Sequence, residues 1–160
     1  RLRGYLREQG YTANEIEAVL SLLPTRIDQV RSRLDAVRTF AKLPEAESLA
    51  AANKRIRNIL HKSAPAGKAV FMPSRLAAAE EKTLYAAFTR IDQAASVQLA
   101  GGRYTEALTS LAALKTPVDA FFDAVMVNVE DVALRNNRLL LLMQLNNAMN
   151  RVADISKLAA

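Results

Sequence analysis

The stretch TPVDAFFDAVMVNVEDVALRNNRLLLLMQLNNAMNRVADISKL, residues 116 to 158, decides the fold, because it contains two helix patterns in succession. In the first, four apolar residues follow the i, i+3, i+4, i+7 spacing of one buried stripe: Val118, Phe121, Phe122 and Val125. Thr116 is a suitable N-cap, and Pro117 fits the first helical position, where no N–H is needed. The pattern predicts a helix that starts at about residue 117.

The second pattern follows Asp131, a residue type that caps helix N-termini. One face of the helix that it opens is apolar: Leu134, Leu141, Leu145, Ala148 and Val152. From Leu139 to Met143 every side chain is apolar, so other elements must cover this helix on several sides. The apolar run is too short to span a membrane. We therefore expect this helix to lie at the centre of a helical bundle.

Arg138 flanks the apolar face of this second helix, so we expect its guanidinium to be partly buried and to need an anionic partner. Asp119 and Asp123 share one face of the preceding helix at i and i+4 and are the candidates for a structural ion pair with it. The alternatives for the two aspartates are a general acid/base pair or metal ligands. No His or Cys lies near them in the sequence to complete a transition-metal site. We therefore favour the structural interpretation and expect no metal site.

Other helix boundaries are marked along the chain. Gly10 is expected to end a short helix, and Thr12 with Glu15 forms a capping box for the next. Ser74 is expected to cap a long helix that Gly101 and its neighbour end. Further helices are predicted over residues 27 to 40, 44 to 62 and 104 to 114. Because no stretch reads as a strand, we predict an all-α bundle of about six or seven helices.

The composition fits one domain spanning residues 1 to 160, since 160 residues with 51% hydrophobic content suffice for one core. The sequence contains no cysteine, which excludes disulfides, thiolate catalysis and cysteine metal sites. The chain begins with Arg1 and has no secretory leader, so we expect a cytoplasmic piece of a longer protein. Residues 1 to 22 are then the end of an upstream region. We expect the isolated piece to be a monomer.

The net charge of +6 belongs mainly to the first third of the chain. Residues 1 to 62 contain 12 Lys and Arg against 7 Asp and Glu, whereas residues 101 to 160 contain 6 of each. A positive field of this kind attracts nucleic acid or an anionic membrane surface. The densest polar and cationic patch lies on the helix predicted for residues 44 to 62: Lys54, Arg55, Arg57, Asn58, His61 and Lys62. The cations can contact phosphates and Asn can read a base edge, although such runs are often only solvated surface.

Several blocks of this sequence resemble one known family. They are RLRGYL (residues 1 to 6), LAAANKRIRNIL (49 to 60), GRYTEAL (102 to 108), PVDAFFDAVMV (117 to 127), DVALRNNRL (131 to 139) and RVADIS (151 to 156). Together they look like the C-terminal anticodon-binding domain of the bacterial glycyl-tRNA synthetase beta subunit. The Asp-Ala-Leu-Arg tetrapeptide that names the wider domain class is matched only as Ala133-Leu134-Arg135, with Asp131 displaced.

This resemblance implies a domain that binds the anticodon stem-loop of glycine tRNA and has no catalytic centre or cofactor of its own. A separate alpha subunit, with ATP and Mg, would make glycyl-tRNA in an assembly of two alpha and two beta subunits. For this role, Lys54, Arg55, Arg57 and Lys62 are candidate phosphate contacts, and His61 is a surface or phosphate contact. Asn58, Arg135 and Asn136 are candidates for reading bases.

Two other classes of function are compatible with the sequence. A structural helical domain that docks the alpha subunit without touching the anticodon would explain the helices equally well. A small independent enzyme has only the Asp119 and Asp123 pair in its favour. A membrane surface is disfavoured, because the basic helices have no Trp and their apolar residues lie on faces that a bundle buries. DNA is not an expected partner.

Overall fold

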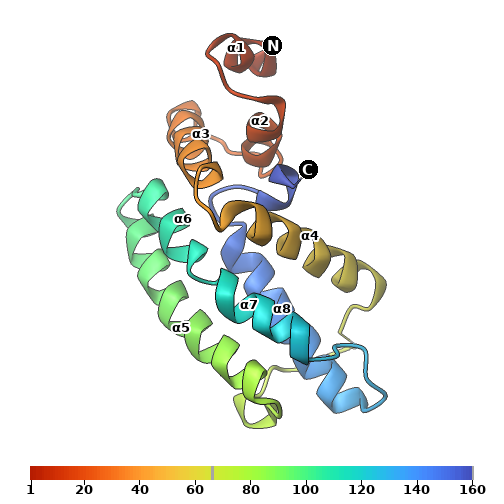
Figure 1. Cartoon of the computed structure of the whole chain (residues 1–160). Coiled ribbons are helices and arrows are strands. Elements are labelled where there is room, and N and C mark those ends of the chain that lie inside the picture. The colour runs from red at the N-terminus through yellow and green to blue at the C-terminus, as the bar shows by residue number, and fades with distance from the viewer. Residues whose placement is uncertain (66, 160) are drawn as a thin grey trace.

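The computed structural model describes residues 1–65 and 67–159, and this part of the chain is helical with no strand (Figure 1). The elements are α1 (Leu2–Glu8), α2 (Ala13–Leu20), α3 (Ile27–Ala41), α4 (Ala46–Lys62), η1 (Pro73–Arg75), α5 (Ala79–Ala100), α6 (Tyr104–Ala112), α7 (Lys115–Ala124), α8 (Val132–Met149) and η2 (Ile155–Leu158). The elements labelled η are short 3-10 helices. The predicted all-α class is confirmed.

Helix α8 is the central helix, as predicted. It packs against α4 and α5, and α7 lies between those two helices in front of it (Figure 1). Leu139, Leu141, Leu142 and Leu145 are each at most 1% exposed, so neighbouring helices cover most of its circumference. Met143 is the exception at 39% exposed. The apolar centre of α8 therefore leaves one apolar side chain at the surface.

The start of α8 is as the sequence predicts, but the start of α7 is not. The Asp131 carboxylate accepts a hydrogen bond from the Leu134 N–H at 3.2 Å and caps α8. Helix α7 begins at Lys115, so Thr116 is not its N-cap. Pro117 is its third residue, still within the first turn, where backbone N–H groups have no helical partner. Pro117 is therefore compatible with a helix that begins two residues earlier than expected.

The capping box of α2 is confirmed, whereas the cap expected at Ser74 is wrong. Ser74 lies in η1, and α5 begins only at Ala79. Leu76, in between, has an extended backbone and is 8% exposed, because it anchors this segment in the core. The Glu81 carboxylate then accepts a hydrogen bond from the Ala78 N–H at 3.0 Å. At the other end, α5 stops before Gly102, whose φ of +73° suits glycine.

Arg138 is buried as predicted, but its predicted partners are wrong. Its Nη2 lies 2.7 Å from the Glu81 Oε1, and Glu81 is fully buried at the start of α5. Asp119 instead faces α4, where it accepts hydrogen bonds from the Ser48 hydroxyl at 3.2 Å and the Lys115 ammonium at 2.8 Å. Asp123 is exposed. The aspartate face of α7 is therefore turned toward α4 and away from Arg138.

The C-terminal segment closes the bundle beside the N-terminal helices. Element η2 packs against both α2 and α4, and the Asp154 N–H donates to the Ala18 carbonyl at 2.7 Å. Ala18 and Val19 of α2 are fully buried. Within residues 1–65 and 67–159, none of the helices combines the length and the apolar character that crossing a membrane would require.

Candidate nucleic-acid interface

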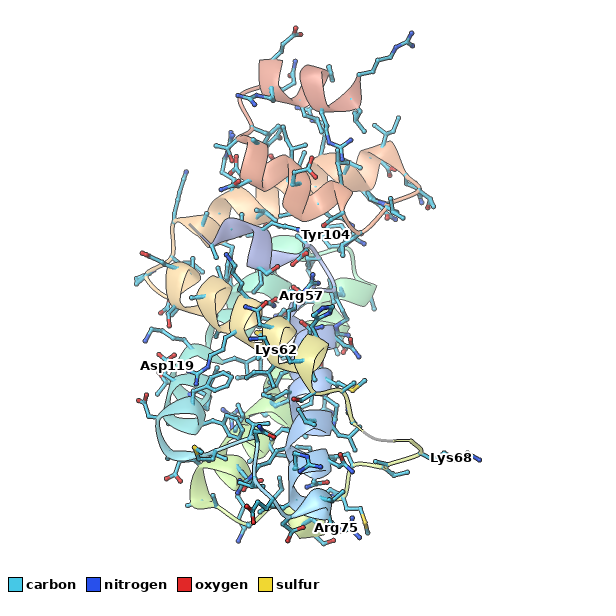
Figure 2. All side chains as sticks on the ribbon, turned by 90° about the vertical axis from the view of Figure 1, so that its right-hand side faces the viewer. Arg57, Lys62, Lys68, Arg75, Tyr104 and Asp119 are labelled. Carbon is cyan, nitrogen blue, oxygen red and sulfur yellow. The ribbon has the colours of Figure 1, made fainter. Side chains whose placement is uncertain are left out.

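One side of α4 carries a row of polar and cationic side chains, which we call the α4 ridge: Lys54, Arg55, Asn58 and Lys62. The opposite side of the helix is buried through Leu49, Ala50, Asn53 and Ile56, so the ridge faces solvent. Together with Ile59 and Ala159, the ridge lines a shallow surface groove. Figure 2 shows α4 on the side toward the viewer, with its last residue, Lys62, labelled.

The ridge can bind a polyanion, because few groups of the fold neutralise its positive charges. Lys54, Asn58 and Lys62 have no hydrogen-bond or ion-pair partner within the described part of the chain. Their charges and amide are therefore available to an external ligand. Lysines of this kind contact phosphates as point charges, and an amide can bond to a base edge.

Arg55 is held in a defined position by an aromatic ring of α7. Its guanidinium carbon lies 4.2 Å from the centre of the Phe122 ring, a cation–π contact. The Phe122 ring in turn meets the Phe121 ring edge-on at 5.4 Å, and Phe121 is fully buried. The core of the bundle therefore supports a planar cation at the surface. Arg55 remains exposed, so its outer face can stack on an unpaired base.

A second groove extends from the ridge to the loop between α7 and α8. Arg55, Lys62 and Phe122 form one side, and residues 125 to 128 of the loop form the other. Met126 in this loop is 71% exposed. The ridge and this loop, more than sixty residues apart in the sequence, thus form one continuous surface with cationic and apolar parts.

Comparison with known proteins places the chain in a family. Residues 49–158, which include most of α4 and all of α8, match the model of the DALR anticodon binding domain. The chain belongs to the DALR anticodon-binding domain family. Over all 160 residues it is also 58% identical to the glycine–tRNA ligase beta subunit of Thiobacillus denitrificans, 57% to that of Nitrosomonas europaea and 56% to that of Delftia acidovorans. The chain spans less than a quarter of the length of these relatives, at 22 to 23%.

The other candidate residues of this DALR domain are less available than the ridge. The Arg57 Nη1 is paired with the Asp154 Oδ2 at 2.8 Å, which joins α4 to η2. The Arg135 Nη1 donates to the Val129 carbonyl at 2.9 Å and so braces the loop before α8. Asn136 is half-buried in α8. For these three residues, contact with a nucleic acid stays a prediction.

His61 is exposed at the C-terminal end of α4, next to Lys62. Helical spacing of about 100° per residue places it between the ridge and Leu60. Within the described part of the DALR domain, His61 has no hydrogen-bond partner. This position suits the surface or phosphate contact that the sequence predicts.

The two aspartates that could have been a catalytic pair border the ridge. Asp119 and Asp123 line a hollow together with Arg55 and Phe122. Asp119 is neutralised by Lys115, whose pKa is raised because its ammonium donates a hydrogen bond to that carboxylate. No group of three or more His, Cys, Asp or Glu in residues 1–65 and 67–159 is placed to hold a metal ion. The arrangement ties α7 to α4.

The sequence did not reveal a second hollow of the DALR domain, on the other side of α4. Apolar residues of two helices line it together with two amides: Leu60, Leu140, Met143, Asn146 and Asn147. The available signal was an Asn-Asn pair and an exposed methionine on a helix that is otherwise buried. A helical wheel does not show which neighbouring segment lies opposite such residues.

Proposed function

We propose that this chain binds the anticodon stem-loop of glycine tRNA, as part of a glycine–tRNA ligase beta subunit. The observation that carries the proposal is the solvent-facing α4 ridge, with Arg55 held on Phe122 at 4.2 Å. The family match to an anticodon-binding domain and the names of the relatives support it. An anticodon loop combines closely spaced phosphates with unstacked bases, and the surface offers a partner for each.

In this proposal the residues of the ridge have different tasks. Lys54 and Lys62 contact phosphates, which gives affinity without sequence preference. The outer face of Arg55 stacks on an unpaired base, and Asn58 bonds to a base edge. The apolar residues of the α7–α8 loop, such as Met126, extend the stacking surface. All the work of this domain is binding and orientation of the RNA.

The chemistry belongs to the rest of the enzyme in this proposal. A separate alpha subunit binds ATP and Mg, activates glycine and transfers it to the tRNA, in an assembly of two alpha and two beta subunits. The complex works in the cytoplasm. The names of the relatives as beta subunits are what support an alpha partner.

The test is a double substitution on the ridge, Lys54→Ala with Arg55→Ala. We expect weaker binding of glycine tRNA, and a slope of log affinity against log salt that is smaller by about 1 for each phosphate that the variant no longer binds. The matched control is Lys82→Ala with Arg90→Ala, because these two exposed cations lie on α5 and the charge change is the same. Binding is measured by fluorescence titration at several salt concentrations, with circular dichroism to confirm the fold.

Two results would contradict the proposal. If the ridge variant is folded and binds as well as the α5 variant, the ridge is not the binding surface. If the unsubstituted chain binds the alpha subunit but no tRNA, the domain is a structural docking module.

A further inference from the structure

The hollow between α4 and α8 has features that the proposed function does not use. Its walls are Leu60 of α4, Leu140 and Met143 of α8, and residues 64, 65, 67 and 69 of the chain that follows α4. Its volume is about 460 Å³, within the range of small-ligand sites. Asn146 and Asn147 are the polar side chains among its lining residues. An apolar hollow with one or two amides suits a flat group that has a polar edge.

A chain of buried amides fixes the orientation of Asn146. The Asn150 Oδ1 accepts a hydrogen bond from the Ile155 N–H at 3.1 Å. Because a backbone N–H can only donate, this contact settles which atom of the Asn150 amide is the oxygen. The same oxygen accepts from the Asn53 amide at 3.0 Å, and Asn53 is fully buried.

The Asn150 Nδ2 must therefore donate, and it does so to the Asn146 Oδ1 at 3.0 Å and to the Asn146 carbonyl at 2.9 Å. The oxygen of the Asn146 amide is thus engaged inside the fold. Its Nδ2 has no partner within residues 1–65 and 67–159. The buried amides therefore fix the orientation of the Asn146 amide, and its unused donor belongs to a residue that lines the hollow.

A lysine and a histidine lie beside the hollow. Lys68 lies between Gly67 and Ala69, which both line the hollow, and extends into solvent on this side of the molecule (Figure 2). His61 follows Leu60 on α4 and lies between the hollow and the ridge. A ligand with a negatively charged backbone can therefore continue from the ridge to the hollow without crossing a carboxylate of α4.

We propose that this hollow accepts one unpaired nucleobase of the bound RNA. Met143 and Leu60 contact the faces of the base, and the Asn146 Nδ2 donates a hydrogen bond to an acceptor atom on its edge. The inference rests on the proposed function and adds a specificity site to it, because the hollow reads a further base beside those that Arg55 and Asn58 contact on the ridge. An apolar side chain of a partner protein would leave the oriented donor unsatisfied, and a phosphate would find apolar walls.

The experiment measures binding of a glycine tRNA anticodon hairpin in which each loop nucleotide in turn is made abasic. The test variant is Asn146→Asp, which keeps an oxygen to accept from Asn150 but replaces the donor by a carboxylate oxygen. The matched control is Asn14→Asp, the same change at an exposed position on α2. A second test variant, Met143→Ala, removes a wall at a partly exposed site and so preserves the core.

We expect Asn146→Asp to weaken binding of the intact hairpin by about tenfold relative to Asn14→Asp, since a donor is removed and an anionic oxygen faces an acceptor. At one loop position the abasic hairpin should bind the parent chain more weakly and should no longer distinguish the parent from the Asn146→Asp or Met143→Ala variant. That coupling identifies the base in the hollow.

The inference is wrong if Asn146→Asp weakens binding of every hairpin equally, or if it does not weaken binding of any hairpin. If the hairpin binds with the full dependence on the ridge but no position couples to Asn146 or Met143, only this inference fails. If the parent chain binds no hairpin, the proposed function fails as well.

Discussion

Helices α3 and α4 both carry several basic residues, but the fold uses them in opposite ways. On α3, the Arg33 Nη1 donates to the Arg151 carbonyl at 2.8 Å and to the Val152 carbonyl at 2.7 Å, and its guanidinium lies 4.8 Å from the centre of the Tyr104 ring. Arg38 of the same helix pairs with Glu15 and covers the Tyr11 ring at 4.5 Å. These arginines connect segments that are far apart in the sequence.

On α4, by contrast, Lys54 and Lys62 face solvent without a partner in the described part of the chain. The difference arises from what lies opposite each helix. Helix α3 packs between α2 and α6, whose carboxylate and ring meet its arginines. On the ridge side of α4, Arg55 meets only the Phe122 ring of α7, and within the described residues Lys54 and Lys62 meet no carboxylate. A basic composition therefore does not locate a binding surface. The partners of each cation do.

The largest expected effect concerns the most buried cation of all those described. Arg138→Ala should lower the free energy of unfolding by about 3–5 kcal/mol, because it leaves the fully buried Glu81 carboxylate without its cationic partner. Urea denaturation followed by circular dichroism measures this loss. Lys54→Ala should leave the same transition within about 0.5 kcal/mol of the parent. If Arg138→Ala unfolds at the same urea concentration as the parent, the distinction between buried structural cations and exposed available ones would not hold.

Arg33→Ala tests α3 directly, and we expect a loss of about 2–3 kcal/mol in the free energy of unfolding, because two carbonyls of the C-terminal segment lose a charged donor and Tyr104 loses its cation–π partner. Urea denaturation measures this loss. The affinity for glycine tRNA, measured where the variant is folded, should equal that of the parent. Weaker tRNA binding by a stable Arg33→Ala variant would extend the binding surface to α3.

The sequence predicted which faces are buried better than it predicted which residues meet. The i, i+3, i+4 spacing identifies the buried stripe of α7, and the uninterrupted apolar run identifies α8 as central. Helical spacing also places Arg138 at the edge of the core, and its burial is confirmed. Its partner Glu81, fifty-seven residues away, could not be found, since periodicity orients each helix about its own axis but does not rank the neighbours that surround it.

For the candidate site, the ridge could be read from the sequence, because the apolar side of α4 defines the opposite one. The sequence places Phe122 in the core stripe of α7, and only the packing of α7 against α4 shows that its ring supports Arg55. The link from Asn53 to Asn146 was missed for a similar reason. It joins α4 to the end of α8 through Asn150, ninety-seven residues from Asn53, and polar residues within helices give no periodic signal.

Arg57 of α4 is both paired inside the fold and partly exposed, so it lies between the structural arginines of α3 and the available cations of the ridge. Its pair with Asp154 leaves its side chain 39% exposed, while Asp154 is 3% exposed. Arg57→Ala should cost about 1–2 kcal/mol of unfolding free energy in urea denaturation, less than Arg33→Ala, because Asp154 keeps hydrogen bonds from the Ser156 N–H and hydroxyl. If tRNA affinity also falls as far as in Lys54→Ala, Arg57 contacts the RNA as well as Asp154.

The smallest expected effect is a pH dependence of stability that comes from the ion pair between Arg38 of α3 and Glu15 of α2 and that has no counterpart on the ridge. Burial acts to raise the pKa of Glu15, but hydrogen bonds from Arg38 and from the Thr12 N–H outweigh it, so the folded pKa lies below the ordinary value. Because the pKa of Glu15 is lower in the folded state, its contribution to stability is fully present above the pKa of the unfolded state, about 4.3. This contribution is lost as the pH falls through the pKa of the folded state.

Glu15→Gln should therefore remove part of the acid dependence of unfolding, while Lys62→Ala, which breaks no carboxylate pair in the described residues, should leave it unchanged. Urea midpoints measured from neutral pH down to about pH 3 give the slopes. The two variants should differ most near neutral pH and converge in acid, where Glu15 of the parent is itself protonated. Parallel curves at every pH would mean that Arg38 does not hold this carboxylate, and the division between structural α3 arginines and available α4 cations would lose one of its supports.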